Sequence, residues 1–197
     1  RSIANISAIP GAAKSLTHIK TLTASSSSTL SFVDGSDDVV LDSTYPIYMF
    51  KYIGIHPATD GAQFQVGFRD GDTNYDATKT SAFFKSQNRE DGNGGSIGYE
   101  TSHDLAQGTG FQNLTQDIGN DNDQNLSGNL YLFNPASTTF VKHFIAKSNS
   151  SASNDRSFND FIGGYCNVTA AIDAVQFKMS SGNIDAGTIK LYGLKDS

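Results

Sequence analysis

The oxygen-bearing side chains of one polar segment are the residues best suited to chemistry. They stand at alternating positions, as Asp70, Asp72, Asn74 and Asp76. This spacing resembles the first half of a calcium-binding loop. The second half departs from it, because Tyr75 stands where glycine is needed and Ser81 where a bidentate glutamate is needed. Asp and Asn also favour turns for steric and capping reasons. The segment is therefore predicted to be a turn, with a Ca²⁺ site as the alternative.

Catalytic signatures are missing from the sequence. It contains no nucleophile elbow, HExxH, P-loop, GxGxxG or CxxC motif. Cys166 is the only cysteine, which excludes a disulfide within the chain, and its apolar surroundings favour a small buried hydrophobe over a nucleophile. We expect no enzyme, with no catalytic residue, no assigned metal ligand and no cofactor. The four histidines fall in four different expected elements, at His18, His56, His103 and His143.

Charge and composition narrow the range of partners. Charged residues make up only 17% of the 197 residues, the formal net charge is -6, and Lys and Arg form no dense cluster. A phosphate-binding footprint is therefore missing, and we expect no nucleic-acid partner. No apolar run reaches the length of a membrane span, so no membrane partner is expected either. The abundance of Ser, Thr, Asn, Asp and Gly favours short strands joined by many turns.

The elements that must position these residues are β-strands. Apolar and polar residues alternate with a period of two in most of the chain, and polar runs rich in Gly, Asn and Asp separate the alternating segments. About nine or ten antiparallel strands are predicted, packed as a single jelly-roll-like β-sandwich, with a helical turn at most in residues 102–107. The expected strands are 15–23, 29–33, 45–56, 62–69, 77–85, 126–134, 138–147, 158–169, 175–179 and 188–194, and residues 97–100 form a brief strand at best.

Residues 1–14 are small and weakly patterned, with a break at Pro10-Gly11. They are predicted to form either an N-terminal arm that reaches a neighbouring subunit or a flexible leader. The chain starts at Arg1 and not at Met, so this end is either processed or lacks its first residues. Residues 15–197 are predicted to form the β-sandwich domain.

The strand predicted at 45–56 is apolar on both faces, which indicates that it is covered on both sides. One cover is the second sheet, and the other is either a long loop or another subunit. The strand at 62–69 is expected to pair with it as a central hairpin, through the turn at 56–61. The segments 175–179 and 188–194 are likewise expected to form a closing hairpin around the turn at 180–183.

Two long polar segments, residues 86–95 and 101–125, are predicted to be surface loops. Loops of this length in a compact domain are usually functional or interfacial. Three loop aromatics, Tyr75, Tyr99 and Phe111, are candidates for binding a glycan, but core or loop-pinning roles are favoured for each.

Seven segments carry a resemblance to a known family. Together they resemble virion structural proteins of marine tailed phages, including cyanophages, which are mostly described as virion structural or tail-fibre-like. The resemblance covers residues 16–197 and implies a place in the virion, with no catalytic residues to carry over. The segments are residues 48–61, 68–71 with 75–80, 104–107, 118–121, 137–144, 164–167 and 179–193.

The resulting expectation is a non-enzymatic virion protein, a fibre, appendage or capsid-decorating component that assembles through symmetric contacts. A homo-oligomer is expected, with a trimer favoured, and other virion proteins are expected partners. The alternative is a receptor-binding module that recognises host-surface glycan or protein through the loops 86–95 and 101–125. An enzyme such as a polysaccharide depolymerase is the least favoured function.

Overall fold

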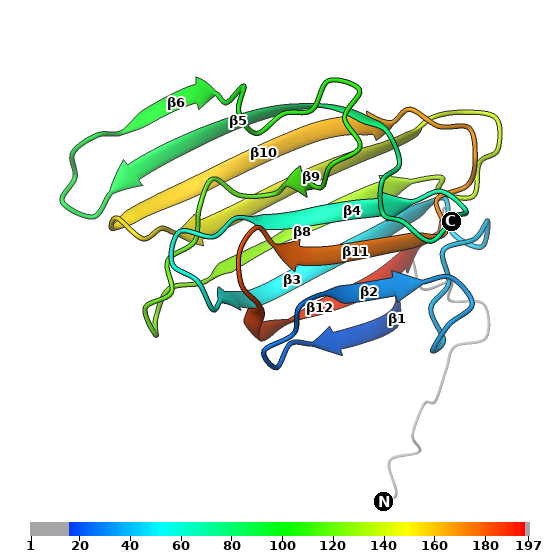
Figure 1. Cartoon of the computed structure of the whole chain (residues 1–197), viewed down its shortest axis with the longest axis horizontal. Coiled ribbons are helices and arrows are strands. Elements are labelled where there is room, and N and C mark those ends of the chain that lie inside the picture. Colours follow the sequence, from blue (N-terminus) through cyan, green and yellow to red (C-terminus); the bar gives the residue numbers. More distant parts are fainter. Residues whose placement is uncertain (1–15, 196–197) are drawn as a thin grey trace, which may run out of the picture.

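The computed structural model describes residues 16–195, and in this range it contains twelve β-strands and no helix (Figure 1). The all-β class is thereby confirmed. The arm predicted at residues 1–14 lies outside the described residues. The strands are β1 (Leu16–Thr23), β2 (Leu30–Val33), β3 (Ile47–Pro57), β4 (Phe64–Arg69), β5 (Lys79–Arg89), β6 (Ser96–Tyr99), β7 (Gln112–Asn113), β8 (Leu126–Phe133), β9 (Lys142–Ser151), β10 (Arg156–Cys166), β11 (Ala174–Met179) and β12 (Ile184–Leu194).

Two antiparallel sheets form the sandwich. The larger has eight strands in the order β1-β12-β3-β8-β9-β10-β5-β6, and the smaller has four in the order β2-β11-β4-β7. Figure 1 shows the smaller sheet lying across the larger one. The predicted sandwich is confirmed, with more strands than the nine or ten expected. β12 lies between β1 and β3, so segments from both ends of the described chain meet in one sheet.

The core lies between the two sheets and is rich in aromatic rings. Strand β9 shows how the strands contribute to this core. Its residues alternate strictly between buried and exposed along most of its length, so every second side chain enters the core. Phe177 of the smaller sheet stacks on Phe64, with ring centroids 5.5 Å apart, and also packs against Phe50 of the larger sheet. All three side chains are completely buried. Each such burial stabilises the fold by roughly 1.5–3 kcal/mol.

The predicted central hairpin is wrong. Strand β3 belongs to the larger sheet, where its partners are β12 and β8, whereas β4 belongs to the smaller sheet and pairs with β11 and β7. The connection between them crosses from one sheet to the other. The apolar faces of the two strands therefore meet across the core, as in the contact between Tyr52 and Phe64.

The predicted closing hairpin is wrong for the same reason. β11 lies in the smaller sheet and β12 in the larger one, and the turn between them also crosses the sandwich. Gly182 has a φ of +69° in this turn, as the Ser-Ser-Gly-Asn sequence predicts. β12 begins at Ile184, four residues before the predicted start. Ile184 pairs with Pro57 of β3, and two irregularities in register separate this pair from Thr188.

The long segment 101–125 is tied to the body of the domain. Residues 102–107 form turns and not a helix. Gln112 is completely buried, accepts a hydrogen bond from Ser81 of β5, and donates one to the backbone oxygen of His103. Leu114 and Ile118 are buried in the core. This segment closes the sandwich over inward-facing residues of β5 and β10.

Candidate functional site: the outer face of the larger sheet

The larger sheet has a face that points away from the smaller sheet. In strand β9, Phe144 and Ala146 point into the core and are buried, while Ile145 and Lys147 point outward and are exposed. The same alternation runs through the neighbouring strands, and residues paired across antiparallel strands share a face. The strand register therefore defines which residues lie together on this side. We call this side the outer face and define it by three cross-strand rows.

The central row contains one residue from each of the eight strands. Its eight members are linked by direct register pairs and combine aromatic rings with lysines. With strands about 4.8 Å apart, the row spans roughly 34 Å. It consists of Tyr99, Phe84, Phe161, Lys147, Asn129, Lys51, Lys190 and Thr21.

The two flanking rows follow from the same register. One is largely apolar and aromatic, and its members are Ala82, Gly163, Ile145, Tyr131, Met49, Tyr192 and His18. The other is largely polar, and its members are Ile97, Ser86, Asn159, Asn149 and Ser127.

A shallow apolar hollow lies near the centre of the outer face. Its volume is about 450 Å³, and its lining includes Phe84, Phe161, Tyr131 and Ile145. The rings of Phe84 and Phe161 stack with centroids 5.0 Å apart and planes 9° apart. The ammonium of Lys147 lies 5.2 Å from the centre of the Phe161 ring, within the range of a cation–π interaction.

The outer face differs in charge from the rest of the chain. Its three rows contain Lys51, Lys147 and Lys190, and no Asp or Glu. The whole sequence carries 20 Asp and Glu residues against 14 Lys and Arg residues. A basic and aromatic surface thus lies on an acidic protein. Such a surface can bind an apolar or acidic partner, and the rows offer no pairing of a nucleophile with a base.

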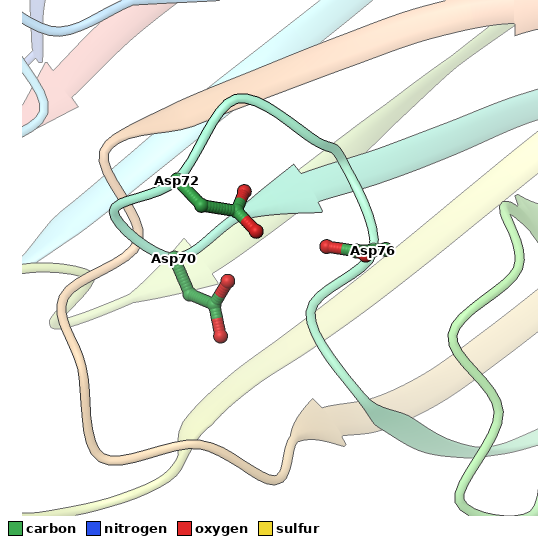
Figure 2. A group of neighbouring side chains, drawn as sticks. All are labelled: Asp70, Asp72 and Asp76. Atoms are coloured by element: carbon green, nitrogen blue, oxygen red, sulfur yellow. The ribbon is translucent and has the colours of Figure 1, made fainter.

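The acidic loop after β4 brings three of the predicted oxygen ligands together. Carboxylate oxygens of Asp70, Asp72 and Asp76 lie within 4.8 Å of one another. Figure 2 shows Asp72 and Asp76 pointing toward each other from opposite sides of the loop. Asp72 also accepts a hydrogen bond of 2.7 Å from the backbone N–H of Asn74, which is the predicted turn. Three carboxylates supply part of the six to eight oxygens that Ca²⁺ takes, so a calcium site stays a prediction.

Other predicted candidates are dispersed over the fold. Two histidines lie on the same side as the outer face, where His18 packs against Tyr192 and His143 against Tyr165. His103 belongs to the segment 101–125, and its side chain is buried next to Phe83. The histidines therefore form no common site.

The loop aromatics divide into two kinds. Tyr75 and Phe111 pack against each other and over Gly67, whose added Cβ would lie 2.7 Å from the Phe111 ring. The predicted pinning role is confirmed for these two residues. Tyr99 is instead 56% exposed on β6, and its hydroxyl donates a hydrogen bond of 2.6 Å to Asp104.

Cys166 lies in a buried row between two lysines. Its cross-strand partners are Lys79 and Lys142, and all three residues are inaccessible to solvent. Burial raises the pKa of the Cys166 thiol to about 12, against a smaller opposing effect of the lysines, so the thiol stays protonated and inert at neutral pH. The predicted role as a small buried hydrophobe is confirmed.

The ammonium of Lys142 is held by backbone oxygens alone. It donates hydrogen bonds to Ser137 at 3.2 Å, to Val168 at 2.8 Å, and to Ala170. Burial lowers the pKa of Lys142 below its ordinary value. This side chain links the loop that precedes β9 to the loop that follows β10.

Asp160 is a buried carboxyl that the sequence does not reveal. It lies in β10, and one of its oxygens accepts a 2.9 Å hydrogen bond from the backbone N–H of Gln116, while the other has no hydrogen-bond partner among residues 16–195. Burial raises the pKa of Asp160 to about 7, although the Gln116 hydrogen bond and the cation of Lys85 act in the opposite direction. The residue gives no sequence signal, because an Asp that follows Asn159 and precedes Phe161 also fits the exposed face of a strand.

Comparison with protein-family models, curated proteins and solved structures gives no match to this chain. The resemblance to phage virion proteins therefore stays a prediction. Within residues 16–195, the structure contains no helix with the length and apolar character needed to cross a membrane.

Proposed function

We propose that this chain is a non-enzymatic structural protein of a bacteriophage virion, a fibre, appendage or capsid-decorating component that assembles through symmetric contacts. One observation carries the assembly role: the outer face presents exposed apolar side chains around the hollow. Ile145 is 55% exposed and Phe84 is 43% exposed. Contiguous exposed apolar surface of this kind marks a protein interaction site. The predicted trimer and the jelly-roll-like topology belong to the same proposal.

The strand predicted to be covered on both sides supports this proposal. In β3, Tyr48, Phe50 and Tyr52 are completely buried against the smaller sheet. On its other side, Met49 is half-buried and Ile53 is 39% exposed, so no described loop covers them fully. Of the two covers expected from the sequence, a loop or another subunit, the second is the one that this exposure favours.

The long loops support a structural role over a loop-based receptor site. Residues 101–125 are anchored by the buried Gln112, Leu114 and Ile118, which leaves them little freedom to adapt to a receptor. The receptor-binding alternative then rests on the tip of the β5–β6 hairpin, where residues 90–95 are exposed.

Two measurements test the proposal. A cryo-electron microscopy map of the phage particle should show this chain as repeated copies in symmetric contact. In solution, sedimentation velocity at micromolar concentration should show a defined oligomer that Ile145→Glu converts to a monomer. Phe140→Glu is the matched control, because Phe140 is 71% exposed but lies in the loop between β8 and β9. A monomeric wild-type protein that is also absent from purified particles would refute the proposal.

A further inference from the structure

The charge of the outer face restricts what can cover it. Lys51 and Lys190 are direct register partners, and Lys147 lies two strands farther along the same row. No carboxylate occurs in the three rows that define the outer face. A partner that buries this face must therefore either leave three ammonium groups without a counter-ion or supply acidic groups itself.

Packing two outer faces against each other meets this difficulty in both two-fold orientations. With the axis along the rows, the lysines of one copy face the same lysines of the other. With the axis along the strands, the lysine half faces the aromatic half around Phe84 and Phe161. That arrangement gains cation–π contacts. Burying an ammonium group without a carboxylate removes its hydration and supplies no counter-ion, and this desolvation outweighs the gain from the cation–π contacts.

A different surface of the same protein has the required charge. The chain carries 20 Asp and Glu residues, all of them outside the three rows, and its formal net charge is -6. Three of these carboxylates converge in the loop after β4, which extends from the smaller sheet and not from the outer face. A second copy can therefore offer an acidic surface to the basic row.

We infer that the outer face of one copy packs against an acidic surface of the next copy, in a head-to-tail contact. This inference rests on the proposed assembly function and specifies its geometry. A head-to-tail interface uses two different surfaces of each subunit, so it closes into a ring of three or more copies or continues as a fibre. It is distinct from a two-fold dimer, in which one surface meets itself.

Subunit mixing tests the geometry. The double variant Phe84→Ser/Ile145→Ser loses exposed apolar side chains of its outer face without adding carboxylates to that face, and it keeps every acidic surface. When it is labelled with a dye at its N-terminal amine and mixed with excess unlabelled wild-type protein, the dye should sediment with the wild-type oligomer. Labelled Phe140→Ser should enter the oligomer both alone and in the mixture. Circular dichroism confirms that each variant is folded before mixing.

Charge reversal provides a second test that leaves the apolar hollow intact. Lys51→Glu/Lys147→Glu should weaken self-association at least tenfold, because the reversed row repels the acidic surface. The wild-type oligomer should also dissociate about tenfold more readily when NaCl rises from low to high concentration, since screening weakens exposed charge pairs. In a two-fold contact with the axis along the rows, like charges would still face each other in the variant, and NaCl would strengthen the association of wild type instead of weakening it.

The outcomes separate the inference from the proposed function. If the labelled double variant stays monomeric beside wild-type oligomers, the contact is two-fold and the inference is overturned, while the assembly function stands. A salt-independent oligomer that survives charge reversal overturns it as well. If the wild-type protein is monomeric in solution and its copies in the particle touch only other proteins, the head-to-tail inference fails although the virion location holds.

Discussion

Replacement of Asp160 by Asn should stabilise the protein at alkaline pH. The carboxyl is completely buried, and its pKa of about 7 lies well above the ordinary value of 3.8. At pH 8, folding therefore holds an ionised carboxylate in a site that favours the neutral form. Asn is neutral at every pH and nearly isosteric, and its side-chain oxygen can still accept the hydrogen bond from Gln116.

The size of the effect follows from the pKa difference. Because the folded-state pKa of Asp160 lies above the unfolded value, its contribution to the free energy of unfolding is fully present below about pH 4. This contribution is lost as pH rises through 7. A difference of about 3 units at 1.36 kcal/mol per unit gives a loss of roughly 4 kcal/mol by pH 8. The variant should match wild type near pH 4 and exceed it by up to about 4 kcal/mol at pH 8.

Urea unfolding followed by far-ultraviolet circular dichroism at pH 5 and pH 8 measures this difference. The charged groups around Asp160 are Lys85, which lies 2.9 Å from Glu100, and Asp117, whose own pKa burial also raises. Asp185→Asn is the control, since it removes one negative charge from an exposed position of β12 and leaves the buried Asp160 unchanged. An Asp160→Asn protein that is less stable than wild type at pH 8, or whose advantage does not change with pH, would refute the reasoning.

Two further changes test the buried lysine and the acidic loop. Lys142→Met should lower the free energy of unfolding by at least about 1–3 kcal/mol, because the backbone oxygens of Ser137, Val168 and Ala170 lose their donor. Unchanged urea unfolding would show that these oxygens find other partners. For the acidic loop, EDTA should leave the melting temperature unchanged, and Asp72→Asn should be neutral because Asn also accepts from the N–H of Asn74. A melting temperature that rises with millimolar Ca²⁺ and falls with EDTA would instead establish a cation site.

The strands themselves could be predicted from alternation, but their pairing could not. The segments 45–56 and 62–69 match β3 and β4 to within two residues at each end. A short turn between two alternating segments indicates a hairpin when both strands lie in one sheet. The same sequence pattern arises when the chain crosses from one sheet to the other, because each strand buries one face in either case. The choice depends on distant partners, here β8 and β12 for β3, which local sequence does not specify.

The outer face could not be predicted from local sequence for a related reason. Phe84, Lys147 and Phe161 become neighbours only through the strand register. One signal did point toward it: the strand at 45–56 is apolar on both faces. The acidic loop, in contrast, was predictable residue by residue, because its members lie within seven positions of one another.

The position of β12 has a consequence for how the protein is made. Within residues 16–195, β1 has a single strand partner, β12, which leaves the ribosome after the other described strands. During synthesis, residues 16–23 therefore lack this partner until β12 emerges, and β3 lacks one of its two neighbours. A chain that stops before β12 cannot complete the larger sheet. Only finished copies would then present the whole outer face, so the strand order itself would keep truncated chains out of an assembly.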